Sequence, residues 1–98
     1  MDIRRDFEDS NKKAIIKVRG RFDFGLHKEF RSTYRDLGAG TKEYVVDLSQ
    51  ASYLDSAALG MLLLLQEHAY AFSARVCIVG AAPDVRRILD IGGIKLQP

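Results

Sequence analysis

The sequence predicts an α/β fold, a single small domain in which a mixed β-sheet of four or five strands packs with about three or four α-helices. Short runs rich in β-branched residues alternate with longer runs whose apolar residues recur every three or four positions. Glycines and turn-forming residues separate these runs. A chain of 98 residues is long enough for one hydrophobic core, so we expect residues 1–98 to form one domain.

The first part of the chain predicts a hairpin followed by a helix. Residues 2–7 form a candidate edge strand, and residues 8–12 are rich in side chains that hydrogen-bond their own backbone in turns. Residues 14–18 predict the second strand, which we expect Gly20 to end. A helix with one buried stripe is then predicted from four apolar residues at helical spacing, namely Leu26, Phe30, Tyr34 and Leu37.

The middle of the chain predicts a strand, a loop and the most buried helix. Residues 44–48 have the composition of a strand buried on both faces, and residues 49–52 that of a loop. The helix that begins at residue 56 has no polar face in its first half. We therefore expect Leu62 and Leu63 to lie in the core, and we interpret Gly60 as a point of close packing on the sheet.

The last part of the chain predicts one more strand and one more helix. Residues 75–79 form the strand, and Cys77 within it is interpreted as a buried strand residue, not a reactive thiol. Pro83 suits the first turn of a short helix, and residues 94–96 are a candidate strand stub. The predicted order is therefore β-β-α-β-α-β-α, with or without a last strand, and with right-handed β-α-β crossovers between mostly parallel strands.

Composition excludes several classes of function. A net charge of +2 is too small to indicate a nucleic-acid partner. The longest apolar run, residues 57–65, is far shorter than the roughly 20 residues that a membrane span needs. The first ten residues lack the apolar core of a signal peptide, so we expect a cytoplasmic protein without direct membrane insertion.

The sequence indicates neither a metal site nor a cofactor. His27 and His68 lie on separate predicted helices, are expected to be solvated, and belong to no Cys/His spacing typical of zinc sites. The glycine spacing of phosphate-binding loops is absent. A G-x-S-x-G nucleophile turn is absent too, which leaves a hydrolase a distant third hypothesis.

The residues most suited to function surround the start of the central helix. Asp55 and Ser56 precede the apolar run, and such side chains accept hydrogen bonds from first-turn N–H groups. Ser56 would then lie at the positive end of the helix dipole, where negative charge is tolerated. Because parallel strands end at the same sheet edge, we expect Asp23 and Phe24 to approach Tyr53, Asp55 and Ser56 there and to form a docking site.

Three segments, GRFDF (20–24), VVDLS (45–49) and LDSAALG (54–60), resemble the STAS family, the sulphate-transporter and anti-sigma-factor-antagonist domains. The resemblance covers nearly the whole chain. It implies that a partner serine kinase, often itself an anti-sigma factor, phosphorylates Ser56 and that a serine phosphatase reverses this. It also matches Asp23 with the family's loop aspartate. Ala57 and Ala58 replace the hydroxyl residue and the glycine that follow the serine in the family pattern.

Two hypotheses of different classes follow. In the first, the protein is a non-enzymatic binding module of the anti-sigma-factor-antagonist type, and reversible phosphorylation of Ser56 switches its binding to a protein partner. In the second, it is a STAS-like subunit of a lipid or anion transport assembly, and Ser56 is only a helix cap. Asp23 likewise has two open interpretations, as the cap of the helix near Leu26 or as a neighbour of Ser56.

Overall fold

The computed structural model describes residues 2–94 and has the predicted α/β fold. A single small domain combines a four-stranded mixed sheet with three α-helices and a 3₁₀ helix, η1. In chain order the elements are β1 (Ile3–Glu8), β2 (Lys13–Phe22), η1 (Phe24–Leu26), α1 (His27–Ser32), β3 (Glu43–Leu54), α2 (Ser56–Ala71), β4 (Arg75–Val79) and α3 (Pro83–Ile91). The predicted order β-β-α-β-α-β-α is thus confirmed. Residues 95 and 96 of the predicted last strand lie outside the described residues.

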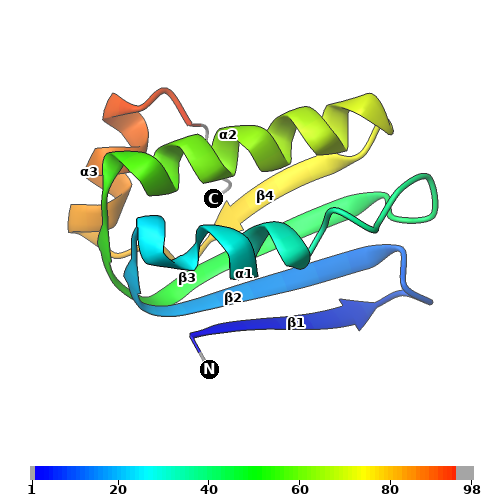
Figure 1. Ribbon diagram of the computed structural model, residues 1–98, viewed down its shortest axis with the longest axis horizontal. Helices are drawn as coiled ribbons and strands as arrows, with labels where there is room; N and C mark the ends of the chain where they lie inside the picture. The colour runs from blue at the N-terminus through cyan, green and yellow to red at the C-terminus, as the bar shows by residue number, and fades with distance from the viewer. Residues whose placement is uncertain (1, 95–98) are drawn as a thin grey trace.

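The sheet has the strand order β1-β2-β3-β4. β1 pairs antiparallel with β2 through the predicted hairpin, whereas β2, β3 and β4 are parallel to one another. Helices α1 and α2 lie side by side on one face of the sheet, and α3 lies near the end where the parallel strands finish (Figure 1). The connections that lead into η1, α2 and α3 therefore all leave from the same edge of the sheet.

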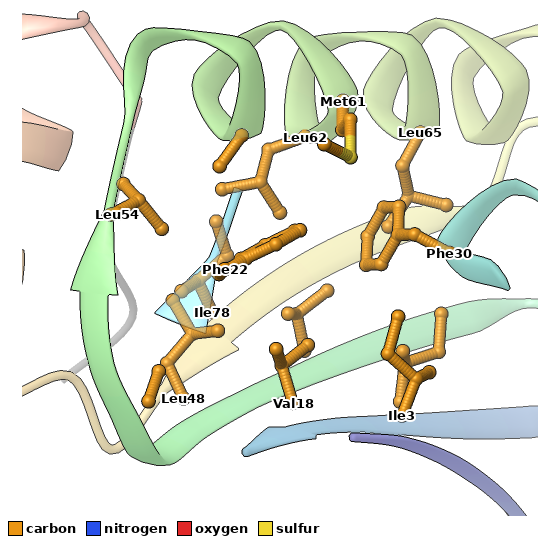
Figure 2. Packing of buried hydrophobic residues seen from close by; sticks show 14 of the residues in the cluster. Ile3, Val18, Phe22, Phe30, Leu48, Leu54, Met61, Leu62, Leu65 and Ile78 are labelled. Carbon is orange, nitrogen blue, oxygen red and sulfur yellow. The ribbon is translucent and has the colours of Figure 1, made fainter. Parts of the chain in front are cut away.

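The core lies between α2 and the inner face of the sheet. Leu62 and Leu65 of α2 are fully buried and point towards the strands, where Phe22, Val18 and Ile78 meet them (Figure 2). Fully burying side chains of this size contributes about 1.5–3 kcal/mol each relative to leaving them exposed. The core is therefore a single layer of side chains, and its packing depends on the position of α2 against the sheet.

Two strands are longer than predicted. β2 continues through Gly20 to Phe22, and β3 continues through the predicted loop at residues 49–52 to Leu54. Gly20 adopts φ = 77°, which glycine tolerates, and the β2–β3 register shifts on either side of it. The predictions failed because these irregularities bend the paired strands without ending them. The bent ends rise towards the helices and bury Phe22 and Leu54 beneath α2.

The predicted helix from Leu26 is correct for three of the four residues of its buried stripe and wrong in its length, and the fourth residue, Leu37, is only half-buried. Leu26, Phe30 and Tyr34 are all buried, but α1 is regular only from His27 to Ser32. The hydroxyl of Thr33 donates to the Phe30 carbonyl oxygen at 2.6 Å, and the Thr33 N–H bonds the same oxygen three residues back. Such side-chain competition for backbone groups ends α1 early and leaves turns as far as residue 42.

α2 is less buried than its composition predicts. Leu62 is fully buried, as expected, but the side chain of Leu63 is 45% exposed, so its assignment to the core was wrong. A Cβ added at Gly60 would meet nothing within 4 Å, so close packing does not explain this glycine either. His68 is not solvated: its Nε2 lies 2.7 Å from the Leu37 carbonyl oxygen, to which it donates. The sheet and α1 together cover only part of this apolar helix.

The outer face of the sheet, opposite α1 and α2, is also less covered than predicted. Tyr44 and Val46 on the inner face are fully buried, whereas Val45 on the outer face is only half-buried. Cys77 pairs with Val45 in the predicted strand and is half-buried as well. Burial, together with the hydrogen bond from its thiol to Glu43, raises the pKa of Cys77 above its usual value, so the thiol stays neutral near pH 7.

Two neighbouring leucines in α2 provide a test of how this helix is oriented against the sheet. We expect Leu62→Ala to lower the free energy of unfolding by about 2–5 kcal/mol, because it leaves a cavity in the core. Leu63→Ala, which removes the same atoms from an exposed position, should lower it by about 0.5 kcal/mol or less. Urea unfolding followed by circular dichroism measures both, and equal losses would contradict the described orientation of α2.

Two glycines should respond to alanine with opposite signs. Gly60→Ala should raise the free energy of unfolding by about 0.4–1 kcal/mol, since the site has helical geometry and open space. Gly80→Ala should lower it, because Gly80 has φ = 76° and an added Cβ would lie 2.9 Å from the Cβ of Ser49. Thermal unfolding distinguishes them, since 1 kcal/mol shifts the midpoint of a domain this size by about 4–8 °C. A destabilising Gly60→Ala would show that α2 requires glycine there.

Candidate functional site

Two strand-to-helix connections meet at the carboxyl edge of the sheet. Phe22 and Leu54 are the last register pair between β2 and β3, so the residues that follow them start from adjacent positions. The N–H of Asp55 donates to the Phe22 carbonyl oxygen at 3.3 Å and extends this pairing by one bond. Asp23 and Phe24 are thereby brought beside Asp55 and the first turn of α2, as the parallel order predicted.

The carboxylate of Asp55 joins the two connections. Its Oδ1 accepts the N–H of Ala58 at 2.8 Å and so caps α2, and its Oδ2 lies 3.4 Å from the Phe24 nitrogen, which donates to it. The alternative interpretation of Ser56 as only a helix cap does not agree with this geometry, because Asp55 holds that position. A carboxylate is the better bridge because its two oxygens can accept from two different backbone groups.

Asp23 takes the first of the two roles that the sequence left open, as the cap of the helix near Leu26, while a role beside Ser56 stays a prediction. Its Oδ1 accepts the Gly25 N–H at 3.0 Å and caps η1, while its backbone leads directly to Phe24 beside Asp55. Its Oδ2 lies 3.6 Å from Nε of Arg21 in an exposed ion pair. The guanidinium of Arg21 in turn lies 4.1 Å from the ring centre of Tyr53. A short chain of contacts thus links the two connections across the top of the sheet.

Ser56 is exposed, and its hydroxyl group is not hydrogen-bonded within the described part of the chain. As the first residue of α2 it makes no side-chain hydrogen bond to any residue in the range 2–94. Two large exposed side chains belong to the same edge of the sheet, Phe24 in the connection after β2 with 62% exposed and Tyr53 near the end of β3 with 39% exposed. Phe24 is steadied by His27, whose ring stacks on it at a centroid distance of 4.4 Å. An exposed hydroxyl, two carboxylates and two aromatic rings suit contact with another macromolecule.

We refer to Asp23, Phe24, Tyr53, Asp55 and Ser56 as the carboxyl-edge site. The structure brings the first four together through Asp55 and through Arg21, and Ser56 follows Asp55 directly. Sequence reasoning did not assign Arg21 or His27 to this group. Each has a local signal: Arg21 lies two residues before Asp23, and His27 lies three residues after Phe24, which is one helical turn.

Within residues 2–94, no three His, Cys, Asp or Glu side chains are grouped as a metal site would require. The same part of the chain contains no helix that is both long enough and apolar enough to cross a membrane.

Comparison with known proteins identifies the family. The family model described as "Mlab, STAS domain" matches residues 6–95. A STAS-domain containing protein of Pseudomonas aeruginosa (strain UCBPP-PA14) is 48% identical over 83 residues, which is 85% of this chain and 82% of that protein. The chain belongs to the STAS domain family, as its sequence segments predicted.

Solved structures share the fold at low sequence identity. The anti-sigma factor antagonist SpoIIAA of Bacillus, which has been solved in unphosphorylated and phosphorylated forms, superposes in the former with a TM-score of 0.77. Its identity is 14%, and the match covers 98% of this chain and 87% of that one. A sulfate transporter family protein from Wolinella succinogenes superposes with a TM-score of 0.75 at 16% identity, covering 84% and 67%. The antagonist and the sulfate transporter family protein thus share this architecture.

Adjacent residues allow the cap assignment to be tested. Asp55→Ala should lower the free energy of unfolding by about 0.5–2 kcal/mol, because it leaves the Ala58 and Phe24 N–H groups without their acceptor. Ser56→Ala should change it by about 0.5 kcal/mol or less, since the hydroxyl accepts no backbone bond. Urea unfolding measures the loss of stability in each variant. A larger loss for Ser56→Ala than for Asp55→Ala would contradict this assignment and would make Ser56 the helix cap.

Proposed function

We propose that this protein is a non-enzymatic phosphorylation switch of the anti-sigma-factor-antagonist type, acting in the cytoplasm. In this proposal the carboxyl-edge site binds a protein partner while Ser56 is unmodified. A partner serine kinase, which is itself an anti-sigma factor in many systems of this family, phosphorylates Ser56 and releases the complex, and a serine phosphatase restores it. The general class rests on the family and the fold, while the switch and its partners are inferred from the site.

The proposal rests on the different roles of Asp55 and Ser56 at the start of α2. Asp55 caps α2, so the Ser56 hydroxyl is exposed and takes part in no bond that modification would break. A phosphate on Ser56 would lie at the N-terminus of a 16-residue helix, where the dipole and unpaired N–H groups favour an anion. The fold should therefore tolerate the modification.

A phosphate on Ser56 would weaken the binding of the partner and would leave the fold of this protein intact. Phosphorylation adds about −1.5 to −2 charges at neutral pH. These charges would join the nearby carboxylates of Asp55 and Asp23, of which Arg21 offsets one through its ion pair. A partner surface that fits a neutral hydroxyl would then face repulsion and an unpaired, desolvated anion. A loss of only about 1.4 kcal/mol weakens binding tenfold, so a single phosphate is enough for a switch.

The second candidate is a STAS-like subunit of a lipid or anion transport assembly. It is supported by the family description and by the likeness to the Wolinella succinogenes protein. That hypothesis gave Ser56 only a capping role, which Asp55 fills instead. A transport subunit would keep the same partner contacts whether or not Ser56 carried charge, so the experiment that tests the switch also separates the two candidates.

We expect Ser56→Asp to fold normally and bind poorly, whereas Ser56→Ala binds constitutively. The partner is first isolated with unphosphorylated protein and identified, and each variant is then titrated against it by calorimetry. The affinity of Ser56→Asp should be about tenfold lower or more, because the added charge lies within the contact. Circular dichroism checks that both variants are folded.

Ser10→Asp is the matched control, because it adds the same charge at an exposed position in the β1–β2 turn, away from the carboxyl edge of the sheet. It should bind like the unmodified protein. The intact mass of protein from its native cells gives an independent check, in which a species heavier by one phosphate maps to Ser56. Equal affinities of the Asp and Ala variants would reject the switch.

A further inference from the structure

We propose that the groove between α1 and α2 is a second docking surface, which takes an acidic amphipathic helix from a protein partner. The groove is open to solvent and has a volume of about 600 Å³. It is distinct from the carboxyl-edge site and the proposal does not depend on phosphorylation of Ser56. Three features carry it: the apolar walls, the charges on the rim and the open helix surface beside them.

Apolar side chains form the floor and one wall of the groove. Phe30 and Tyr34 of the α1 segment and Met61 of α2 lie at its base and are buried. Leu64 forms the α2 wall with 56% of its side chain exposed. A side chain of this size gains about 1.5–3 kcal/mol when it is fully buried, so an apolar partner residue placed against Leu64 would be favoured.

α2 offers more apolar surface than the domain itself uses. Leu63 lies next to Leu64 and is 45% exposed, on a helix whose solvent-facing side carries no continuous polar stripe. Gly60, one turn before Leu64, is open and would let a partner backbone come close. Helices that are apolar all round are ordinarily buried on all sides. Here α1 and the sheet leave one side uncovered, which indicates that a further element covers it in a complex.

The rim of the groove is basic on the α1 side. Arg31 and Arg35 lie one turn apart on this rim, both are exposed, and neither forms an ion pair with a carboxylate in residues 2–94. The α2 side contributes one carboxylate to the lining, that of Glu67. Two guanidinium groups spaced by one helical turn match carboxylates at positions i and i+4 of a partner helix.

The apolar walls and the basic rim together define which kind of partner segment the groove would bind. An amphipathic helix with one apolar stripe would place that stripe against Leu64, and Glu or Asp beside the stripe would meet Arg31 and Arg35. A second copy of this chain would bring the same two guanidinium groups to the contact and would be repelled. The groove also continues towards the carboxyl-edge site, because His27 lines one end and stacks on Phe24. One partner could therefore occupy both surfaces.

The test uses two synthetic helical peptides of about 18 residues, stapled to stay helical. Both carry the same leucine stripe, flanked in one by glutamates and in the other by lysines. Each is titrated into ¹⁵N-labelled protein. We expect the glutamate peptide to shift amide signals of α1 and of the Gly60–Glu67 part of α2, and the lysine peptide to leave them unchanged at the same concentration.

Charge reversal on the protein provides the matched control. Arg31→Glu with Arg35→Glu should weaken binding of the glutamate peptide about tenfold, since two exposed ion pairs become repulsive. Arg86→Glu with Arg87→Glu reverses two exposed charges on α3 and changes the net charge equally, but should leave the affinity unchanged. Leu64→Asp should also weaken binding, with the fold checked by circular dichroism.

Several outcomes would overturn the proposal. They are equal binding of both peptides, equal effects of the two charge reversals, and amide shifts confined to other surfaces. Self-association through the groove, detected by sedimentation velocity and removed by Leu64→Asp, would assign the surface to a second copy instead. Preferential binding to anionic lipid vesicles would assign it to a membrane. Ser56→Asp should bind the glutamate peptide normally, so failure of the switch and failure of the groove are distinguishable.

Discussion

The arrangement of the carboxyl edge depends on one carboxylate. Asp55 accepts the first-turn N–H of Ala58 and the N–H of Phe24, and so connects the start of α2 with the segment that leaves β2. Without it two backbone donors would lose their partner, and the two connections would be joined only through strand pairing and the contacts of Arg21 with Asp23 and Tyr53. Because this role belongs to Asp55, the adjacent hydroxyl of Ser56 remains free for chemistry. The capping residue, Asp55, is thus followed directly by the residue that we propose is modified.

The bent strands bring these connections to the same place. β2 and β3 shift register around Gly20 and continue to Phe22 and Leu54, which pack beneath α2. Had the strands ended where their apolar runs end, the two connections would begin several residues earlier and farther from the helices. The bends therefore set both the depth of the core and the height of the site above the sheet.

Only part of the surface of α2 is covered by the rest of the domain, so the residues that stabilise the fold differ from those that a partner can contact. Leu62 and Leu65 pack the helix against the sheet, whereas Leu63 and Leu64 are exposed, and Leu64 lines the groove together with Arg31 and Arg35. The same helix thus holds the core together on one side and presents apolar surface on the other. Partner binding at the outward side would leave the core contacts unchanged, so the domain can bind and release without refolding.

By itself the sequence determined the order of the elements, the parallel strands, the family and the edge of the sheet at which the five candidate residues lie, because strand and helix periods and the Asp55–Ser56 pair are local signals. Other features were decided by tertiary structure. Asp55 accepts a second bond from Phe24, which is 31 residues away in the chain and is brought to it only by the folded structure. Leu62 and Leu63 are identical neighbours in the sequence, yet Leu62 is fully buried because its side chain points to the strands, whereas Leu63 is 45% exposed. A local pattern shows which residues are apolar, but burial is settled by the neighbours that other segments supply.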